Sequence, residues 1–515
     1  MFRFFQKNKQ KVIDEAVGDI NRQFEGIRLS RSLDKNVAII KELFTDVDIL
    51  RTKDIHNNHD ESLKYCILFN DGVVNSMMIN ENVIKPLMLS SAARPGRDLL
   101  DTVMQQVVQI GESEKSDSIK DIVEALSYGD TILFADGAAE ALILNTKGFT
   151  LRSIGEPDNE KSLSGPREGF TEALITNLSL IRRKVRTHAL KMKFQSFGKR
   201  TQTQACVCYI DGLVNKKILD ELIRRLATID MDAVLDVNYI AEQIRDAPHS
   251  PFRATYYTER PDIVIAKLLE GRIALFVDGS PVVITVPYLF IENFQSTEDY
   301  YINYWYTSFS RSLRILAFLL TVLVPAFYVA IVAYHHEMLP TPLLISITKE
   351  RTGVPLPAAL EAFVMLIVFD LLRETGIRMP TGVGQALSIV GALVIGQAAV
   401  EAKLVAAPMI IVVAIAGITT LIVPKLTPAV IPIRFLFLLL ATMFGLYGLI
   451  LGVAAVTIHV LNLRSFGVPQ VMLSGRLKYQ DIKDTFIRAP WWRMIMRPKM
   501  IAADRPRMKP GGGNG

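Results

Sequence analysis

The chain has few of the residues that build metal or disulfide sites. It holds only three cysteines and seven histidines in 515 residues. Cys66, Cys206 and Cys208 lie in apolar, strand-like runs, whereas a disulfide framework uses more cysteines, placed at the surface. Cys206 and Cys208 would share one strand face, but no second pair of Cys or His residues follows at zinc-ligand spacing. We therefore expect a reduced, cytoplasmic setting, no metal and no cofactor.

Motifs for catalysis and phosphate binding are also missing. The stretch SFGKRT resembles part of a phosphate loop, but Lys193 stands where that motif needs its first glycine. No pattern in the sequence places a nucleophile beside a base. The start, MFRFFQKNKQK, lacks the apolar stretch of a cleavable signal peptide, which predicts that the long region before the first apolar span stays in the cytoplasm. These observations favour a non-enzymatic protein.

Charged residues make up only 21% of the chain, and the mean hydropathy is positive. Apolar residues are concentrated after residue 312, which is typical of a membrane protein with a soluble first half. After residue 463 the chain carries eleven lysines and arginines against three aspartates. A basic tail next to an apolar span predicts a cytoplasmic flank near anionic membrane lipid. Nucleic acid is the weaker alternative, because the tail lies against the membrane.

Two segments of the first half are repeated. Residues 66–75, CILFNDGVVN, return at 206–215 as CVCYIDGLVN, and residues 129–137, GDTILFADG, return at 271–279 as GRIALFVDG. Each is a short apolar run that ends in Asp-Gly, a preferred tight-turn pair. Turn chemistry explains Asp71 better than a phosphate or metal role does. The matched spacing predicts a structure built twice.

The expected fold class is an α/β soluble region of two homologous subdomains, followed by an all-α transmembrane helix bundle. The basic segment between the copies is predicted to continue as a helix, either with a solvated face or with a docking surface for lipid or an acidic partner. The expected segments are an N-terminal extension (1–34), soluble subdomain 1 (35–150), a basic helical linker (151–202), soluble subdomain 2 (203–290), an aromatic interfacial segment (291–312), a transmembrane domain (313–462) and a basic cytoplasmic tail (463–515).

Four uncharged stretches are long enough to cross about 30 Å of hydrocarbon as helices. They are 315–334, 379–400, 404–424 and 435–458. A fifth apolar segment, 354–372, carries two acidic residues. If the first half and the tail both lie in the cytoplasm, the number of crossings is even. We therefore expect four spans, with 354–372 as a membrane-embedded segment that is re-entrant, interfacial or packed within the bundle.

The span at 379–400 has small residues at every fourth position, which lets another helix approach closely. Ordinary tight packing explains this pattern. The functional alternative is self-association around a central pore, in which apolar rings gate by dewetting. The residues of this pore or self-association helix are Gly384, Gln385, Ser388, Ala392, Val394, Gly396 and Gln397.

The acidic residues of segment 354–372 are Glu361 and Asp370. An ionisable residue at membrane depth indicates a functional site. Asp370 lies three residues before Arg373, which is the spacing of a helical ion pair and favours a paired interfacial cluster. Glu361 has no equally close partner in the sequence. We therefore expect Glu361 to act in ion passage or in a subunit contact.

Three long stretches resemble the GerA family of spore germination proteins, the A subunits of nutrient germinant receptors. They are GPREGFTEALITNLSLIRRKVRTHALKMKFQSFGKRTQT, YTERPDIVIAKLLEGRIALFVDGSPVVITVP and GIRMPTGVGQALSIVGALVIGQAAVEAKLV. They occur in the order found in the family, and the resemblance covers about residues 30–480. It implies no catalytic residue.

The resemblance implies a homo-oligomer in the spore inner membrane, which acts with a transporter-like B subunit and a lipoprotein C subunit. Nutrient binding would lead to ion release, with the A subunit forming the ion path. The stage V AF-type paralogue, an accessory germination protein, is similar throughout and is the alternative. A secondary transporter is disfavoured, because transporters have their repeats inside the membrane, and here the repeat is in the soluble half.

Overall fold

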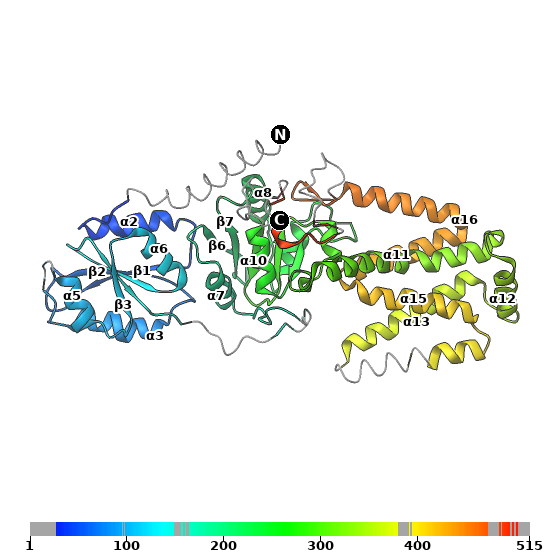
Figure 1. The fold of residues 1–515 in the computed structure, drawn as a ribbon, viewed down its shortest axis with the longest axis horizontal. Coiled ribbons are helices and arrows are strands. Elements are labelled where there is room, and N and C mark those ends of the chain that lie inside the picture. Colours follow the sequence, from blue (N-terminus) through cyan, green and yellow to red (C-terminus); the bar gives the residue numbers. More distant parts are fainter. Residues whose placement is uncertain are drawn as a thin grey trace.

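The structure is a computed structural model of the chain. It describes residues 27–94, 96, 98–148, 156–157, 160, 164–379, 391, 394–471, 484–485, 487–494, 497–498 and 501–502. The molecule is elongated, with one sheet and its helices at one end, a second sheet in the middle and a group of long helices at the other end (Figure 1).

The first soluble subdomain is an antiparallel five-stranded sheet in the order β1-β2-β4-β5-β3. Alternate residues of β2 enter two different cores, because side chains on a strand alternate between faces. Cys66 and Leu68 pack with α2 and α6, whereas Tyr65 and Ile67 pack with the short helices on the opposite face. The elements are α2 (Leu33–Leu43), β1 (Leu50–His56), β2 (Lys64–Asn70), α3 (Ser76–Ile79), η1 (Asn80–Ile84), α4 (Lys85–Leu89), α5 (Leu99–Thr102), η2 (Val103–Val107), β3 (Ser113–Ser116), α6 (Ile119–Tyr128), β4 (Thr131–Ala135) and β5 (Ala141–Leu144).

The second subdomain repeats this plan, with its sheet in the order β6-β7-β9-β10-β8. Each strand occupies the place of its counterpart in the first sheet, which confirms the predicted pair of similar α/β subdomains. The elements are α7 (Leu174–Lys184), β6 (Leu190–Phe197), β7 (Thr203–Ile210), α8 (Lys216–Ala227), α9 (Val237–Gln243), β8 (Tyr256–Thr258), α10 (Pro261–Leu269), β9 (Ile273–Val277) and β10 (Val283–Val286).

The segment expected to be a basic helical linker is part of this second repeat. Its helix, α7, ends at Lys184, and after a short connection Leu190–Phe197 form the edge strand β6 rather than a continuation of the helix. Lys191 and Lys193 made this stretch resemble a basic helix face. In the structure they alternate with apolar residues along a strand, and Lys191 is buried and donates to the carbonyl oxygen of Leu43 at 3.3 Å.

The two subdomains share one apolar core. Cys66 of β2 and Cys208 of β7 belong to the same buried cluster, which also takes in α2 and α7. A parallel bridge joins Val47, which lies just before β1, to Met192 of β6. The backbone N–H of Asp48 donates to the carbonyl oxygen of Met192 at 2.9 Å. The three cysteines are therefore buried packing residues, each with a free thiol.

Long helices follow the second subdomain. Among the described residues, two helices, Tyr304–Tyr334 and Pro424–Asn462, are long and apolar enough to cross a membrane, and Ala407–Ile422 is a shorter apolar helix. The elements of this part are η3 (Phe290–Phe294), η4 (Thr297–Tyr300), α11 (Tyr304–Tyr334), η5 (His336–Met338), α12 (Thr341–Arg351), α13 (Ala358–Arg378), α15 (Ala407–Ile422), η6 (Pro424–Leu426) and α16 (Thr427–Asn462).

Helix α16 folds back on itself at Gly445, which has the non-helical backbone angles φ 61° and ψ −139°. Gly448 then lies against the backbone of Leu440, and the Cβ position of Gly452 is 2.9 Å from the Leu440 side chain. Glycine permits this close antiparallel contact because it has no side chain. The stretch 435–458, which we expected to be one continuous span, is therefore divided between two antiparallel helices.

The described part of the basic tail returns to the second subdomain. β11 (Arg464–Ser465) and β12 (Val468–Pro469) form a short hairpin, and η8 (Trp491–Arg493) follows further along. Phe466 and Val468 enter the core of the second subdomain together with Ile501. The last described residues, Ile501 and Ala502, pack against that subdomain, where Ala502 forms a bridge with Val214.

Candidate coupling site between the soluble region and the long helices

The residues predicted to form the pore or self-association helix are described only in part. Gly384, Gln385, Ser388 and Ala392 lie outside the described residues. Residues 394–401 are helical, with Val394 and Gln397 exposed. Gln397 Nε2 donates to Glu401 Oε1 at 2.9 Å.

Gly396 is buried against α15 of the same chain, and its Cβ position is 3.7 Å from Ile410 Cγ2. The described part of this helix therefore has one face packed within the chain and another, with Val394, left open.

Glu361 is fully buried in the first turn of α13 and has two partners. Arg351 Nη2, from the end of α12, lies 2.9 Å from its Oε1. Its Oε2 accepts a hydrogen bond of 3.0 Å from the backbone N–H of Ala406, which is the N-cap of α15. A carboxylate at this place satisfies a free N–H at the start of α15 and complements the helix dipole. Helical spacing in the sequence did not indicate this partner, because Arg351 belongs to a separate helix, α12.

We expect Glu361→Gln to lower the free energy of unfolding by about 2–3 kcal/mol, because Arg351 loses its counter-ion inside the protein. Glu374→Gln is the matched control, since Glu374 forms an exposed pair with Arg378 at 2.7 Å, and such pairs contribute about 0.5 kcal/mol or less. Thermal unfolding in detergent, followed by circular dichroism, measures both variants. Equal melting temperatures for Glu361→Gln and the wild type would contradict the structural role.

Asp370 pairs mainly with an arginine that sequence spacing did not indicate. Arg434 Nη2, in the first half of α16, is 2.5 Å from Asp370 Oδ2, whereas the predicted partner Arg373 is 3.7 Å from Oδ1. Arg434 is fully buried, and its Nε and Nη1 atoms have no hydrogen-bond partner among the residues that the structure describes. One carboxylate thus serves two guanidinium groups and ties α13 to α16.

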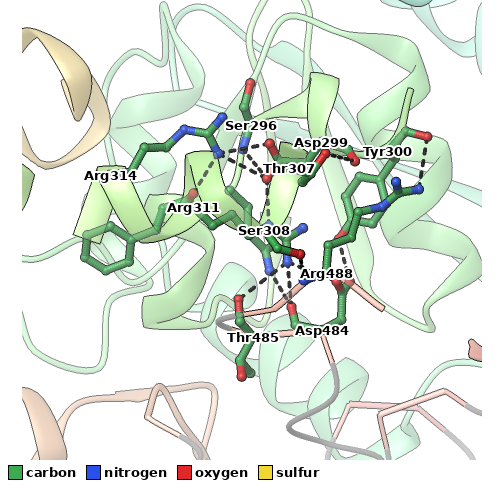
Figure 2. Close-up of polar contacts among 12 residues, drawn as sticks. Ser296, Asp299, Tyr300, Thr307, Ser308, Arg311, Arg314, Asp484, Thr485 and Arg488 are labelled. Carbon is green, nitrogen blue, oxygen red and sulfur yellow. Dashed lines mark hydrogen bonds and ion pairs between the residues drawn. The ribbon is translucent and has the colours of Figure 1, made fainter. Parts of the chain in front are cut away.

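A buried ionic network joins η4, the start of α11 and the tail (Figure 2). Arg311 of α11 lies at its centre. Its Nε is 2.7 Å from Asp299 Oδ2, and its Nη1 is 2.9 Å from Asp484 Oδ1. Arg314 Nη1 is 3.0 Å from the second oxygen of Asp299. The arginines therefore bridge a carboxylate from η4 and one from the tail.

The tail reinforces this network through Asp484 and Arg488. Tyr300 OH donates to Asp484 Oδ2 at 2.7 Å, and Arg488 Nη1 donates to the carbonyl oxygen of Ile302 at 2.8 Å. Burial raises the pKa of Asp484, and the positive charge of Arg311 opposes that rise. Burial also raises the pKa of Tyr300 well above its ordinary value. The phenol therefore remains a hydrogen-bond donor to the carboxylate.

The turn between α15 and α16 also contacts the second subdomain. Lys425 Nζ donates to Tyr256 OH at 2.8 Å and to the carbonyl oxygen of Gln295 at 3.1 Å. At the other end of α16, His459 Nε2 lies 2.9 Å from Ser250 Oγ. Both ends of the folded-back α16 thus rest on the same subdomain as the start of α11.

The chain matches the family model described as Bacillus/Clostridium GerA spore germination protein over residues 38–500. It belongs to the GerA family. It is 39% identical to spore germination protein KA of Bacillus subtilis, over 93% of this chain and 88% of that protein. It is 37% identical to spore germination protein GerLA of Bacillus cereus, over 86% of this chain and 90% of that protein. The family resemblance read from the sequence is confirmed, and the chain takes part in spore germination.

A solved structure is also similar to this GerA-family chain. It is the N-terminal domain of the A subunit of the Bacillus megaterium spore germinant receptor GerK3, with 30% sequence identity and a TM-score of 0.41. The match covers 51% of this chain and 98% of that domain. The chain is also 39% identical to the membrane protein YfkQ of Bacillus subtilis, over 90% of each protein.

The coupling residues of this GerA-family chain were missed in the sequence, although a signal was present. Asp299, Arg311 and Arg314 flank the first apolar span, where charged residues are usually exposed at the membrane surface. Asp484 and Arg488 lie more than 170 residues further along the chain. The signal was Asp484 itself, an acidic residue within a tail rich in positive charge. Its partner could be identified only from the fold.

Proposed function

We propose that this chain is the membrane subunit of a spore germinant receptor, and that it transmits nutrient binding into ion release. The observation that carries the proposal is the buried Asp299–Arg311–Asp484 junction in a chain of a germination family. A rigid junction of this kind transmits a displacement of the soluble region to α11, because buried ion pairs have few alternative arrangements.

We further propose that the chain oligomerises through helix 379–400 and lines the ion path with it. The exposed Val394 and Gln397 support this, because an apolar and an amide side chain at the open face suit a gated, water-filled passage. The packed face, with Gly396, fixes the helix on α15.

The proposed location is the spore inner membrane, with the soluble region and the tail in the cytoplasm. Both ends of α16 contact the second subdomain, which supports an even number of crossings. The two halves of α16 count as two crossings instead of one, and we propose α13 as a further full crossing. The proposed number of membrane crossings therefore rises from four to six. The proposed partners are a transporter-like B subunit, a lipoprotein C subunit and further copies of this chain.

The direct test is reconstitution of the purified chain in liposomes with a cation-flux readout, with and without its candidate B partner. The proposal expects flux that depends on the B partner and on nutrient. A chain that oligomerises but conducts no cation under any of these conditions would contradict the ion-path role.

We expect Gly396→Leu to abolish the oligomer, because a leucine at 396 would push this helix away from Ile410 of α15 and displace its open face. Gly396→Ala is the matched control, since its Cβ would be at an ordinary 3.7 Å from Ile410 Cγ2. Chemical crosslinking in membranes measures both. An unchanged oligomer in Gly396→Leu would rule out this helix as the association surface.

A further inference from the structure

The two soluble repeats differ in how one end of each sheet is completed. In the first repeat the turn after β2 leads to Val74, which pairs in antiparallel fashion with Lys147, just beyond β5. The backbone N–H of Asn75 donates to the carbonyl oxygen of Thr146 at 2.8 Å, and the backbone N–H of Gly148 donates to the carbonyl oxygen of Val73 at 3.0 Å. The repeat therefore completes itself with its own next residues.

In the second repeat the equivalent residue, Val214, pairs in antiparallel fashion with Ala502. The residues just beyond β10 are not available there, because the chain turns toward the long helices. Tyr288 and Phe290 instead donate their backbone N–H groups to Ser465 Oγ at 2.9 Å and to the carbonyl oxygen of Gln470 at 3.0 Å. A segment from the far end of the chain takes the place that 146–148 holds in the first repeat.

The described tail residues pack tightly against this end of the second subdomain. Ile501 is fully buried in the core of the second subdomain. Gly271 has φ +88°, and its Cβ position is 2.8 Å from Ala502 Cβ and 2.6 Å from the carbonyl oxygen of Leu213. Arg497 Nε donates to the carbonyl oxygen of Leu269, at the end of α10, at 2.6 Å. A side chain at Gly271 would collide with the tail.

On its way to this place the tail crosses the start of α11. Asp484 pairs with Arg311, and the backbone N–H of Arg488 donates to Ser308 Oγ at 3.2 Å. The rings of Trp491 and Trp492 pack on Tyr300 and Tyr304, with centroids 5.9 and 5.7 Å apart. The tail therefore holds α11 at one point and the second subdomain at another.

We infer that the tail residues 497–498 and 501–502 stand in for the missing last segment of the second α/β repeat, and that the tail is a permanent strap that makes this subdomain and the start of α11 one moving body. The sequence reading of the tail as a lipid-facing flank does not apply to Arg488, Ile501 and Ala502, since all three are buried in protein. The coupling role of the strap rests on the proposed function, whereas its place in the fold rests on the contacts given above.

A disulfide between Val214→Cys and Ala502→Cys in the full chain tests the strap. Antiparallel partners have Cα atoms about 4.5–5.5 Å apart, within the range that a disulfide spans. The pair Val74→Cys and Lys147→Cys is the positive control, because it is the same bridge in the first repeat. Val74→Cys with Ala502→Cys is the mismatched control. The natural cysteines are buried and should not interfere.

We expect mild oxidation in membranes to crosslink the 214–502 pair and the positive control, but not the mismatched pair. Failure of the 214–502 pair beside a working positive control would overturn the inference. The crosslinked chain should also keep its ion release. If oxidation abolished that release and reduction restored it, the tail would have to detach, and a permanent strap would be excluded. A chain without ion release in any state would contradict the proposed function and leave the crosslinking result valid.

Hydrogen exchange gives a second test without engineered cysteines. Ile501→Asp should accelerate exchange of the amides around Val214 and Gly271 at least about tenfold, because a charge would replace a buried side chain. Ile487→Asp is the matched control, since Ile487 lies in the same tail and is 69% exposed. The amides around Val74 should not change in either variant. Equal exchange in the two variants around Val214 would overturn the inference.

Discussion

Replacing Arg311 with methionine should unfold the junction and stop nutrient-dependent ion release. Asp299 and Asp484 would both lose a partner at less than 3 Å, inside a site where Arg311 itself is fully buried. Breaking a buried ion pair by removing one partner costs about 3–5 kcal/mol, because it leaves charge without compensation. Arg311→Met should therefore be among the most damaging single changes in the chain.

Intrinsic fluorescence can measure this effect without an added probe. The three tryptophans of the chain, Trp305, Trp491 and Trp492, all lie at the junction. Thermal unfolding followed by their emission should begin at a much lower temperature in Arg311→Met. Arg378→Met is the control, because Arg378 forms an exposed pair and its loss should cost about 0.5 kcal/mol or less. A wild-type fluorescence transition in Arg311→Met would show that the network does not hold the junction together.

Asp370→Leu should be similarly damaging within the helices. It removes the carboxylate that Arg434 and Arg373 share, and Arg434 then loses its ion pair with Asp370 while it remains buried. We expect the free energy of unfolding to fall by about 3–5 kcal/mol, with loss of ion release. Circular dichroism of the purified chain in detergent, during a denaturant titration, measures the change.

The double variant Asp370→Leu with Arg434→Met separates a structural pair from a functional one. Two apolar side chains of similar size often replace a buried ion pair with no loss of stability. We therefore expect the double variant to recover most of the stability that Asp370→Leu loses. If ion release recovers too, the pair is only structural. Additive losses of the two single changes would contradict a direct Asp370–Arg434 interaction.

The duplicated soluble region could be predicted because its signal is local. Strand-like runs that end in Asp-Gly at matched spacing identify strands and turns without knowledge of the rest of the fold. The strand β6 was missed for a local reason as well. Its lysines alternate with apolar residues at a sheet edge, and the preceding α7, with three basic residues in its last turn, suggested that one basic helix continued.

The ion pairs of the candidate site were harder to predict from the sequence, because their partners are far apart in the chain. Glu361 and Asp370 were identified from their charge in an apolar segment, but Arg351 and Arg434 were not assigned to them. Helical spacing ranks only neighbours three or four residues away. The bend at Gly445 was hidden for a similar reason, since a glycine in an apolar run is compatible with a straight span as well as with a hairpin.

By itself the amino-acid sequence determined the family, the duplicated α/β plan and the apolar character of the second half. These properties follow from composition, short-range periodicity and motif order, which do not depend on how distant segments meet. Only the tertiary structure decided which charges neutralise one another, where α16 turns back and where the tail is seated. A buried charge takes whichever opposite charge the packing brings within about 3–4 Å, and an incomplete sheet end accepts any segment that fits its backbone and its core. These contacts join residues that are far apart in the sequence and meet only in the folded chain, as Val214 and Ala502 do.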